Sequence, residues 1–379
     1  MQPCLSVAPG RLGAGNVVFL LGAGASYDHG YPLVREFLAA KYLAWLFDQC
    51  VGIPAGVGDH SIALAQAEQF RKTSENFEEV LTAAFETSAD YSRVIDYAYW
   101  LLSTVWDIVR SRMLGTTAEY LGLATLIFEI SQAGRCSVVT FNYDTTVEDA
   151  LSCLGGMMAR RGMPAASLYF NYGFARPIAN VLPERTITEF TGTYLPRSHP
   201  NGRVPILKLH GSVTTLACEH CGGVHYLPLD ANRADLPAKA CNICGGGSLE
   251  LLMVPPGKRK QIPKALDELW LKAEDELASS ALVVIAGYSL PEYDAEARTL
   301  LQTALVGKDV LLVDPAPNAS AIEFLSKTAG ANLRVIQQTT GTFLRQELNA
   351  FVPGFIDKVT ESCAPQYLYP ERMAGCPRA

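Results

Sequence analysis

The sequence predicts an α/β fold in which an open parallel β-sheet is covered by helices on both faces. Six short runs are continuously apolar rather than alternating, as in strands that are buried on both sides. They are VVFLL at 17–21, SVVTF at 137–141, ILKL at 206–209, ALVVIA at 281–286, VLLVD at 310–314 and LRVIQQ at 333–338. Most of them end in a turn rich in Gly, Asn, Asp or His. Ligands of open α/β sheets bind beyond the carboxyl ends of the strands, so the residues after these runs form the candidate site.

The segments between the expected strands differ in character. Residues 33–133 are mostly helix-compatible, so we expect a helical insertion between the first two core strands. Residues 155–204 are richer in Gly, Pro and polar residues, which predicts a long excursion with one short strand near SLYFNY. We therefore place one domain over 14–350 and a Pro-containing tail, a candidate interface arm, over 351–379.

The bulk composition narrows the classes of partner. The chain has 379 residues, of which 49% are hydrophobic, and a formal net charge of −7 at pH 7. An acidic chain does not suit direct binding to a nucleic-acid backbone, which normally needs a basic surface. No apolar run reaches the roughly 20 residues of a membrane helix. The first sixteen residues lack a basic region followed by an apolar core, so we expect a cytoplasmic protein without a signal peptide or a membrane partner.

The cysteines carry the most specific pattern in the sequence. Four of the ten cysteines form two CxxC pairs, Cys218 with Cys221 and Cys241 with Cys244, with nineteen residues between the pairs. Two such turns supply four thiolates for a closed tetrahedral zinc site. A closed site is structural, so we expect Zn²⁺ to hold together a small zinc-ribbon module at about 214–250 and to do no chemistry.

The first predicted strand runs directly into a glycine-rich turn. Its residues are Gly22, Ala23, Gly24, Ala25 and Ser26. A dehydrogenase fingerprint would have a third glycine where Tyr27 stands, and an acidic residue about 20 positions later, so that interpretation fails. The turn could still offer backbone N–H donors at a helix start to a pyrophosphate.

Polar residues follow four of the other runs. His210 comes after ILKL, and its ordinary pKa near 6.5 suits general-base work, although a structural histidine fits equally well. Asn142 and Asp144 follow SVVTF and could address a ligand from one turn, or form an ordinary Asx turn and N-cap. The turn Gly287-Tyr288-Ser289-Leu290 and the acidic Asp314 follow the two later runs, and an acid there can bind ribose hydroxyls.

The order of these elements resembles the sirtuin (SIR2) family. GAGAS, the Gly-Pro turn at 30–32, FNYD, KLHGS, the two CxxC pairs, GYSL and VDP follow one another over most of residues 17–315. The resemblance implies a Rossmann-like NAD-binding domain with a smaller zinc module. It also implies that NAD+ is consumed as a substrate rather than used as a hydride carrier.

The resemblance also implies roles for individual residues. Gly22, Ala23, Gly24, Ala25 and Ser26 match the loop that holds the NAD phosphates, and Gly287 and Ser289 match the turn that closes on the dinucleotide. His210 matches the catalytic histidine, and Asn142 and Asp144 match the pair near the nicotinamide ribose. Asp314 falls where the family often has an asparagine facing the adenosine ribose.

Several departures make the chain look like the divergent bacterial SIR2-like proteins, some of which are NAD hydrolases in anti-phage defence. Protein deacylases of the family follow the zinc module with a strand that pairs with the acyl-lysine peptide. Here LELLMVPPGKRK places Pro255 and Pro256 in that region, which removes two backbone donors from such pairing. NFEEVL at 76–81 and GYSLPEYD at 287–294 also look like the divergent group.

The favoured hypothesis is an NAD+ hydrolase that releases nicotinamide and ADP-ribose as a regulated, NAD-depleting effector in bacterial anti-phage defence. A toxic activity of this kind requires control, so we expect a homo-oligomer or a regulatory partner, such as an ATPase or a nucleic-acid-handling protein. One alternative is an NAD-dependent protein deacylase or ADP-ribosyltransferase. The other is a non-catalytic assembly module that senses NAD or ADP-ribose.

Overall fold

The structure is a computed structural model, and it describes about two thirds of the chain. The described residues are 16–27, 30–50, 60–72, 74–87, 98, 100–106, 108–109, 118–160, 170–174, 179–180, 204–226, 240–254 and 262–351. The tail after Phe351 and the segment with Pro255 and Pro256 lie outside them, as does most of the excursion at 155–204. Within the described part of the chain, none of the helices combines the length and the apolar character that crossing a bilayer requires.

The core is a seven-stranded sheet in which every neighbouring pair is parallel. In spatial order the strands are β11 (Leu333–Ile336), β10 (Asp309–Val313), β9 (Ser280–Ala286), β1 (Asn16–Leu21), β2 (Arg135–Thr140), β5 (Val204–Lys208) and β3 (Phe170–Asn171). All six predicted strands are present, and β3 is the short strand expected near SLYFNY. The predicted α/β class with a parallel sheet is confirmed.

Two apolar clusters cover the faces of this sheet. Along β1, Val17, Phe19 and Leu21 belong to one cluster, whereas Val18 and Leu20 belong to the other. This split follows from the period of two in a strand and explains why the run is apolar at every position. The first face packs against α6 (Ala118–Ala133), α7 (Thr146–Arg160) and α11 (Thr340–Phe351), and the second against α8 (Asp267–Ala278), α9 (Ala295–Ala304) and α10 (Ala319–Ala329).

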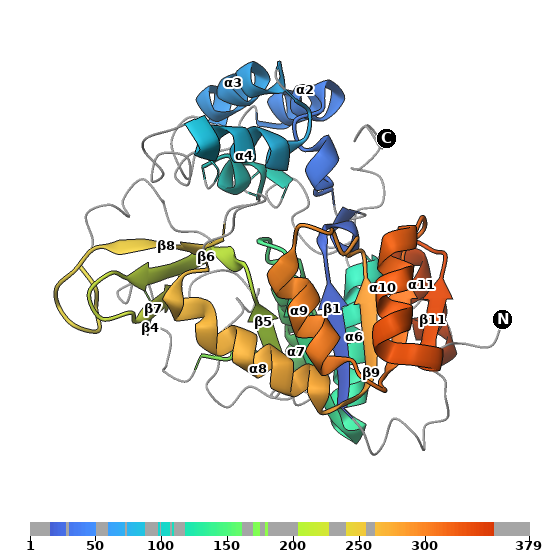
Figure 1. Ribbon diagram of the computed structural model, residues 1–379. Helices are drawn as coiled ribbons and strands as arrows, with labels where there is room; N and C mark the ends of the chain where they lie inside the picture. Colours follow the sequence, from blue (N-terminus) through green and yellow to red (C-terminus); the bar gives the residue numbers. More distant parts are fainter. Residues whose placement is uncertain are drawn as a thin grey trace.

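A group of helices with its own core lies beyond one end of the sheet (Figure 1). It contains the 3₁₀ turn Val34–Glu36, α2 (Ala40–Cys50), α3 (His60–Arg71), α4 (Phe77–Thr87) and the described helical residues between 98 and 109. We call these residues the helical module. The predicted insertion at 33–133 is thus divided, because α6 packs on the sheet and not in the module.

The second sheet has four strands and carries the cysteines. Its order is β4 (Ala179–Asn180), β7 (Val224–Tyr226), β6 (Gly211–Cys218) and β8 (Leu249–Met253). β6 is antiparallel to both β7 and β8, and it begins three residues after β5 ends. We call the described residues between 211 and 254 the cysteine module; it includes the predicted zinc module at 214–250.

Candidate active site and metal centre

Four neighbouring strands, β9, β1, β2 and β5, bring most of the predicted site residues to one edge of the sheet. The glycine loop after β1 forms a 3₁₀ turn over Ala23–Ala25 rather than the start of an α-helix. The amide of Gly22 donates to the carbonyl of Ala286 at 3.1 Å, and that of Gly24 donates to the carbonyl of Gly287 at 2.8 Å. The Gly22 amide therefore bonds to the last residue of β9 and the Gly24 amide to the loop after it, and a phosphate could use the Gly24 amide only by replacing Gly287.

Gly287 makes this close approach possible. Its φ is +62°, which side chains rarely tolerate, and a Cβ there would lie 2.0 Å from the amide nitrogen of Ala25. The same turn holds the ring of Tyr288 stacked on Phe141 with centroids 4.4 Å apart, and leaves Ser289 exposed. The turn predicted to close on the dinucleotide is thus packed against the glycine loop.

Asn142 connects the β2 end to the glycine loop. Its side-chain Nδ2 donates to the carbonyl of Gly22 at 2.9 Å and to Oγ of Ser26 at 3.1 Å. The hydroxyls of Ser26 and Tyr120 lie 3.2 Å apart, so the contact continues into α6. The backbone amide of Asn142 donates to Oγ1 of Thr140 at 3.0 Å, which fixes the turn. The structure therefore joins two elements that the sequence analysis assigned to one site.

The structure gives Asp144 the local role that the sequence left open. Its Oδ1 accepts a hydrogen bond from the amide of Thr146 at 2.9 Å and another from the Thr146 hydroxyl. This is an Asx turn at the beginning of α7. Asp314 behaves similarly, since its Oδ1 accepts from the amide of Ala316 at 2.8 Å. Each of these carboxylates has at least one oxygen committed to its own turn.

His210 lies in an aromatic surrounding at the β5 end. Its side chain is buried, and its ring centroid lies 5.0 Å from that of Phe141 and 6.3 Å from those of Tyr143 and Trp270. The indole of Trp270 donates to the carbonyl of Leu209 at 3.1 Å and so holds the residue before the histidine. Trp270 lies on α8, far along the chain, and no motif in the sequence pointed to it.

The turn after His210 also requires glycine. Gly211 has φ +74°, and a Cβ there would lie 1.8 Å from the carbonyl oxygen of Leu252 on β8. The carbonyl of His210 accepts from the amide of Val254 at 2.9 Å, and the hydroxyl of Tyr143 donates to the carbonyl of Val254 at 2.6 Å. The end of the cysteine module is thereby fixed against the candidate histidine.

The helical module contacts the same edge of the sheet. The indole of Trp106, which is buried, donates to Oγ1 of Thr145 at 3.0 Å, and its ring packs with Val213 and Tyr143. The Tyr293 hydroxyl, in the loop after β9, donates to the carboxylate of Glu78 on α4. The NFEEVL and GYSLPEYD stretches, noted separately in the sequence, therefore meet in space.

The four cysteines of the two CxxC pairs come together in the cysteine module. Their sulfur atoms all lie within 4.8 Å of one another, with Cys218 and Cys244 3.8 Å apart and Cys221 and Cys241 3.7 Å apart. Four ligands at a Zn–S distance of about 2.3 Å in a tetrahedron would lie about 3.8 Å apart. The donor set and its spacing therefore fit Zn²⁺ in a closed structural site.

Backbone amides lie close to several of the cysteine sulfurs. The amides of Gly223 and Ile243 lie 3.4 Å from the sulfurs of Cys221 and Cys241. Hydrogen bonds from nearby backbone amides lower the pKa of Cys218 to about 7. Nδ1 of the buried His225 lies 3.1 Å from the carbonyl of Gly223, and its Nε2 lies 3.6 Å from the sulfur of Cys241. His225 thus borders the four-cysteine cluster.

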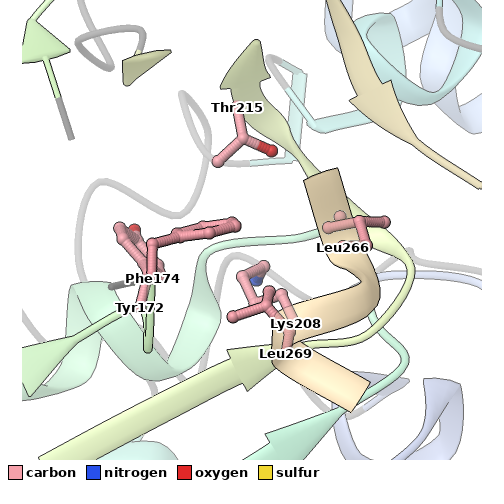
Figure 2. A pocket seen from close by; sticks show the side chains of 7 residues that line it. Tyr172, Phe174, Lys208, Thr215, Leu266 and Leu269 are labelled. Atoms are coloured by element: carbon pink, nitrogen blue, oxygen red, sulfur yellow. The ribbon is translucent and has the colours of Figure 1, made fainter. Parts of the chain in front are cut away.

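A small pocket borders the end of β5, beside Lys208 (Figure 2). Its lining comes from the segment after β3, from β5 and β6, and from the start of α8. The lining residues are Tyr172, Phe174, Lys208, Gly211, Thr215, Leu266 and Leu269.

Together, the fold and these contacts define an open α/β protein with a candidate ligand site at the carboxyl ends of its central strands and, beside it, a small module whose four cysteines could hold a metal ion. No family model matches the chain, and no curated protein matches it in sequence. Among solved structures, it is similar to a Sir2 homologue in complex with NAD, at 14% identity and a TM-score of 0.45 over 93% of each chain. It is also similar to a mutant Sir2 homologue in complex with ADP-ribose, at 14% identity and a TM-score of 0.45 over 95% of this chain and 99% of that one.

Proposed function

We propose that the protein cleaves NAD+ at the bond between nicotinamide and ribose. The observation that carries the proposal is that the side-chain amide of Asn142 donates hydrogen bonds to both Gly22 and Ser26. These bonds connect the predicted phosphate loop to the predicted catalytic asparagine. His210 lies in the turn after the neighbouring strand β5, and Phe141 packs against both its ring and Tyr288. A nucleotide at this edge would have its phosphates near the glycine loop and its reacting ribose near Asn142 and His210.

The reaction consumes only NAD+ and water, and the side chains of the site assist it. The oxygen of a water molecule forms a bond to C1′ of the ribose, and the bond from C1′ to the pyridinium nitrogen breaks. That nitrogen keeps the electron pair and leaves as neutral nicotinamide. A ring nitrogen of His210 takes the proton of the water or of a ribose hydroxyl, and Asn142 orients the attacking group. Asp144 shapes the turn on the nicotinamide side.

The contacts of Val254 favour hydrolysis over protein deacylation. Both backbone groups of this residue, the first after β8, are already used, its amide by His210 and its carbonyl by Tyr143. Pro255 and Pro256 follow and have no amide hydrogen to offer. A peptide that binds by strand addition needs free backbone groups at such an edge. The chain offers fewer of them here than a deacylase would need.

We further propose that the activity is regulated in trans, as an NAD-depleting defence effector requires. The bond from Gly24 to Gly287 supports this idea, because the loop after β9 must move before a phosphate can use that amide. Assembly into an oligomer, or binding of a partner to the helical module or the tail, could supply that movement. A monomer that is fully active alone at every concentration would contradict regulation but not cleavage.

The test is incubation of the purified full-length protein with NAD+, with and without an acetyl-lysine peptide. Lysate of phage-infected cells serves as a source of activator in parallel reactions. A hydrolase releases nicotinamide and ADP-ribose without the peptide, whereas a deacylase releases nicotinamide only when the peptide is present. Binding of NAD+ without release under any of these conditions would support a sensing module instead.

A further inference from the structure

A buried ion pair lies directly beneath the candidate site. Nζ of Lys208, the last residue of β5, lies 3.1 Å from Oε1 of Glu148 on α7, and their side chains are only 3% and 1% exposed. The ammonium group also donates to the backbone carbonyl of Asp144. The hydroxyl of Tyr172 donates to the same Glu148 oxygen at 3.4 Å. The pair therefore joins β5, the turn after β2 and the first turn of α7.

Burying two charges is costly, so this pair needs an explanation. Burial raises the pKa of Glu148, and the nearby Lys208 only partly opposes that rise. Apolar residues of similar volume would often be at least as stable at such a position. The pocket beside Lys208 has mostly apolar walls, including Tyr172, Leu266 and Leu269 (Figure 2), so the lysine stem would also suit a methionine.

The position of the pair suggests what the charge is for. Lys208 precedes His210 by two residues, and the carbonyl that it holds belongs to Asp144, two residues after Asn142. An apolar side chain could fill the same space but could not donate to that carbonyl. Lys208 is thus a direct polar link between the strand end that carries the histidine and the turn that carries the asparagine.

We propose that Lys208, held by Glu148, is a positioning residue that fixes the β2 turn, and with it Asn142, relative to His210. The inference rests on the proposed NAD+ cleavage. A displacement of about 1 Å in a catalytic group can cost about 100-fold in rate, so the link matters even though it does not touch the substrate.

The experiment compares three variants of the full-length protein by thermal unfolding, NAD+ turnover and amide hydrogen exchange. Lys208→Met breaks the link and leaves the buried Glu148 without its cation. Lys208→Met with Glu148→Met removes both charges and restores an apolar interior. Arg135→Met is the matched control, since Arg135 pairs with the buried Glu276 at the opposite, amino-terminal end of β2.

Lys208→Met should lower both the unfolding midpoint and kcat, with a fall in kcat of about 100-fold and little change in KM. The double variant should regain the midpoint but keep the low kcat, because the Asp144 carbonyl still lacks its donor. If the single variant does not fold, the double variant alone decides. Arg135→Met should lower the midpoint and keep the wild-type kcat.

Recovery of kcat together with the midpoint in the double variant would overturn the inference, and so would an equal loss of kcat in Arg135→Met. If the wild-type protein never cleaves NAD+, the proposed function fails, and amide exchange still tests the link. In that case residues 143–146 should exchange faster in the double variant than in the wild type and in Arg135→Met, and unchanged exchange would refute the link.

Discussion

The candidate site and the cysteine module hold their functional residues in different ways. The site residues follow strands whose side chains are almost completely buried, and backbone hydrogen bonds connect the loops after neighbouring strands. The cysteine module exposes residues 242–248, and its four sulfurs meet beside Cys218, the last residue of β6. The apolar core of the sheet therefore positions the site residues, whereas the cysteine module has few buried side chains around its sulfurs and would gain most from a metal bound by the four thiolates.

Loss of the proposed zinc should produce the largest loss of structure, and that loss should be confined to the cysteine module. Structural zinc contributes on the order of 10 kcal/mol to the folding of small domains, so Cys221→Ser should release zinc and raise amide exchange across the described residues of the cysteine module. Metal content and hydrogen exchange measure the two effects. Cys153→Ser, on α7, is the control and should retain the metal. A Cys221→Ser protein that keeps its zinc and its protection would contradict the assignment.

A side chain at Gly287 should disturb the site and spare the module. Alanine there must adopt φ near +62° and avoid the Ala25 amide, which costs about 1–3 kcal/mol in strain and separates the two loops. We expect a lower unfolding midpoint, weaker NAD+ binding in calorimetry and an unchanged zinc content. Gly246→Ala, at a glycine of the cysteine module with open space around it, is the matched control and should change none of these. Wild-type NAD+ affinity in Gly287→Ala would show that the loop contact is irrelevant to binding.

The smallest expected effect is a dependence of the protein's stability on pH that comes from the buried carboxyl group of Glu148. Burial raises the pKa of Glu148 above its ordinary value of 4.5, so its contribution to stability is fully present below pH 4.5 and is lost as the pH rises through the folded-state pKa. The stability of the wild type relative to Glu148→Gln should therefore fall with rising pH.

The exposed Glu323 provides the control of opposite sign. Its hydrogen bond and ion pair with Lys327 lower its pKa, so its contribution should be present above pH 4.5 and lost as the pH falls. Urea unfolding of Glu148→Gln and Glu323→Gln across pH 4.5 measures how the free energy of unfolding of each variant, relative to the wild type, changes with pH. The same slope in both variants would mean that the burial of Glu148 has no effect on its titration.

The sequence predicted the strands well because their apolar runs are short and unmixed with polar residues. It predicted helices between the first two core strands, but LGLATLIFEI in α6 is apolar on most sides, and such a pattern does not reveal which core the helix joins. The Cys4 cluster was predictable because the ligand spacing is local. Asp144 stayed ambiguous because an Asx turn and a ligand contact use the same residues.

Other parts of the site depend on contacts between residues far apart in the chain, which a single sequence does not display. Trp270 reaches the Leu209 carbonyl from α8, and Lys208 meets Glu148 from another element. The hydrogen bond from the Gly24 amide to the Gly287 carbonyl also joins residues far apart in the chain. It changes the expectation that the glycine loop offers its backbone N–H groups to a phosphate.

The most direct test of the account is the release of nicotinamide from NAD+ by the wild type and by His210→Ala, together with calorimetric binding of NAD+ to both. General-base help is worth roughly 10²–10⁴-fold, so the variant should bind NAD+ as the wild type does and cleave it slower by that factor. Equal rates of nicotinamide release by the two proteins would contradict the central role given to His210 and to the strand-end site.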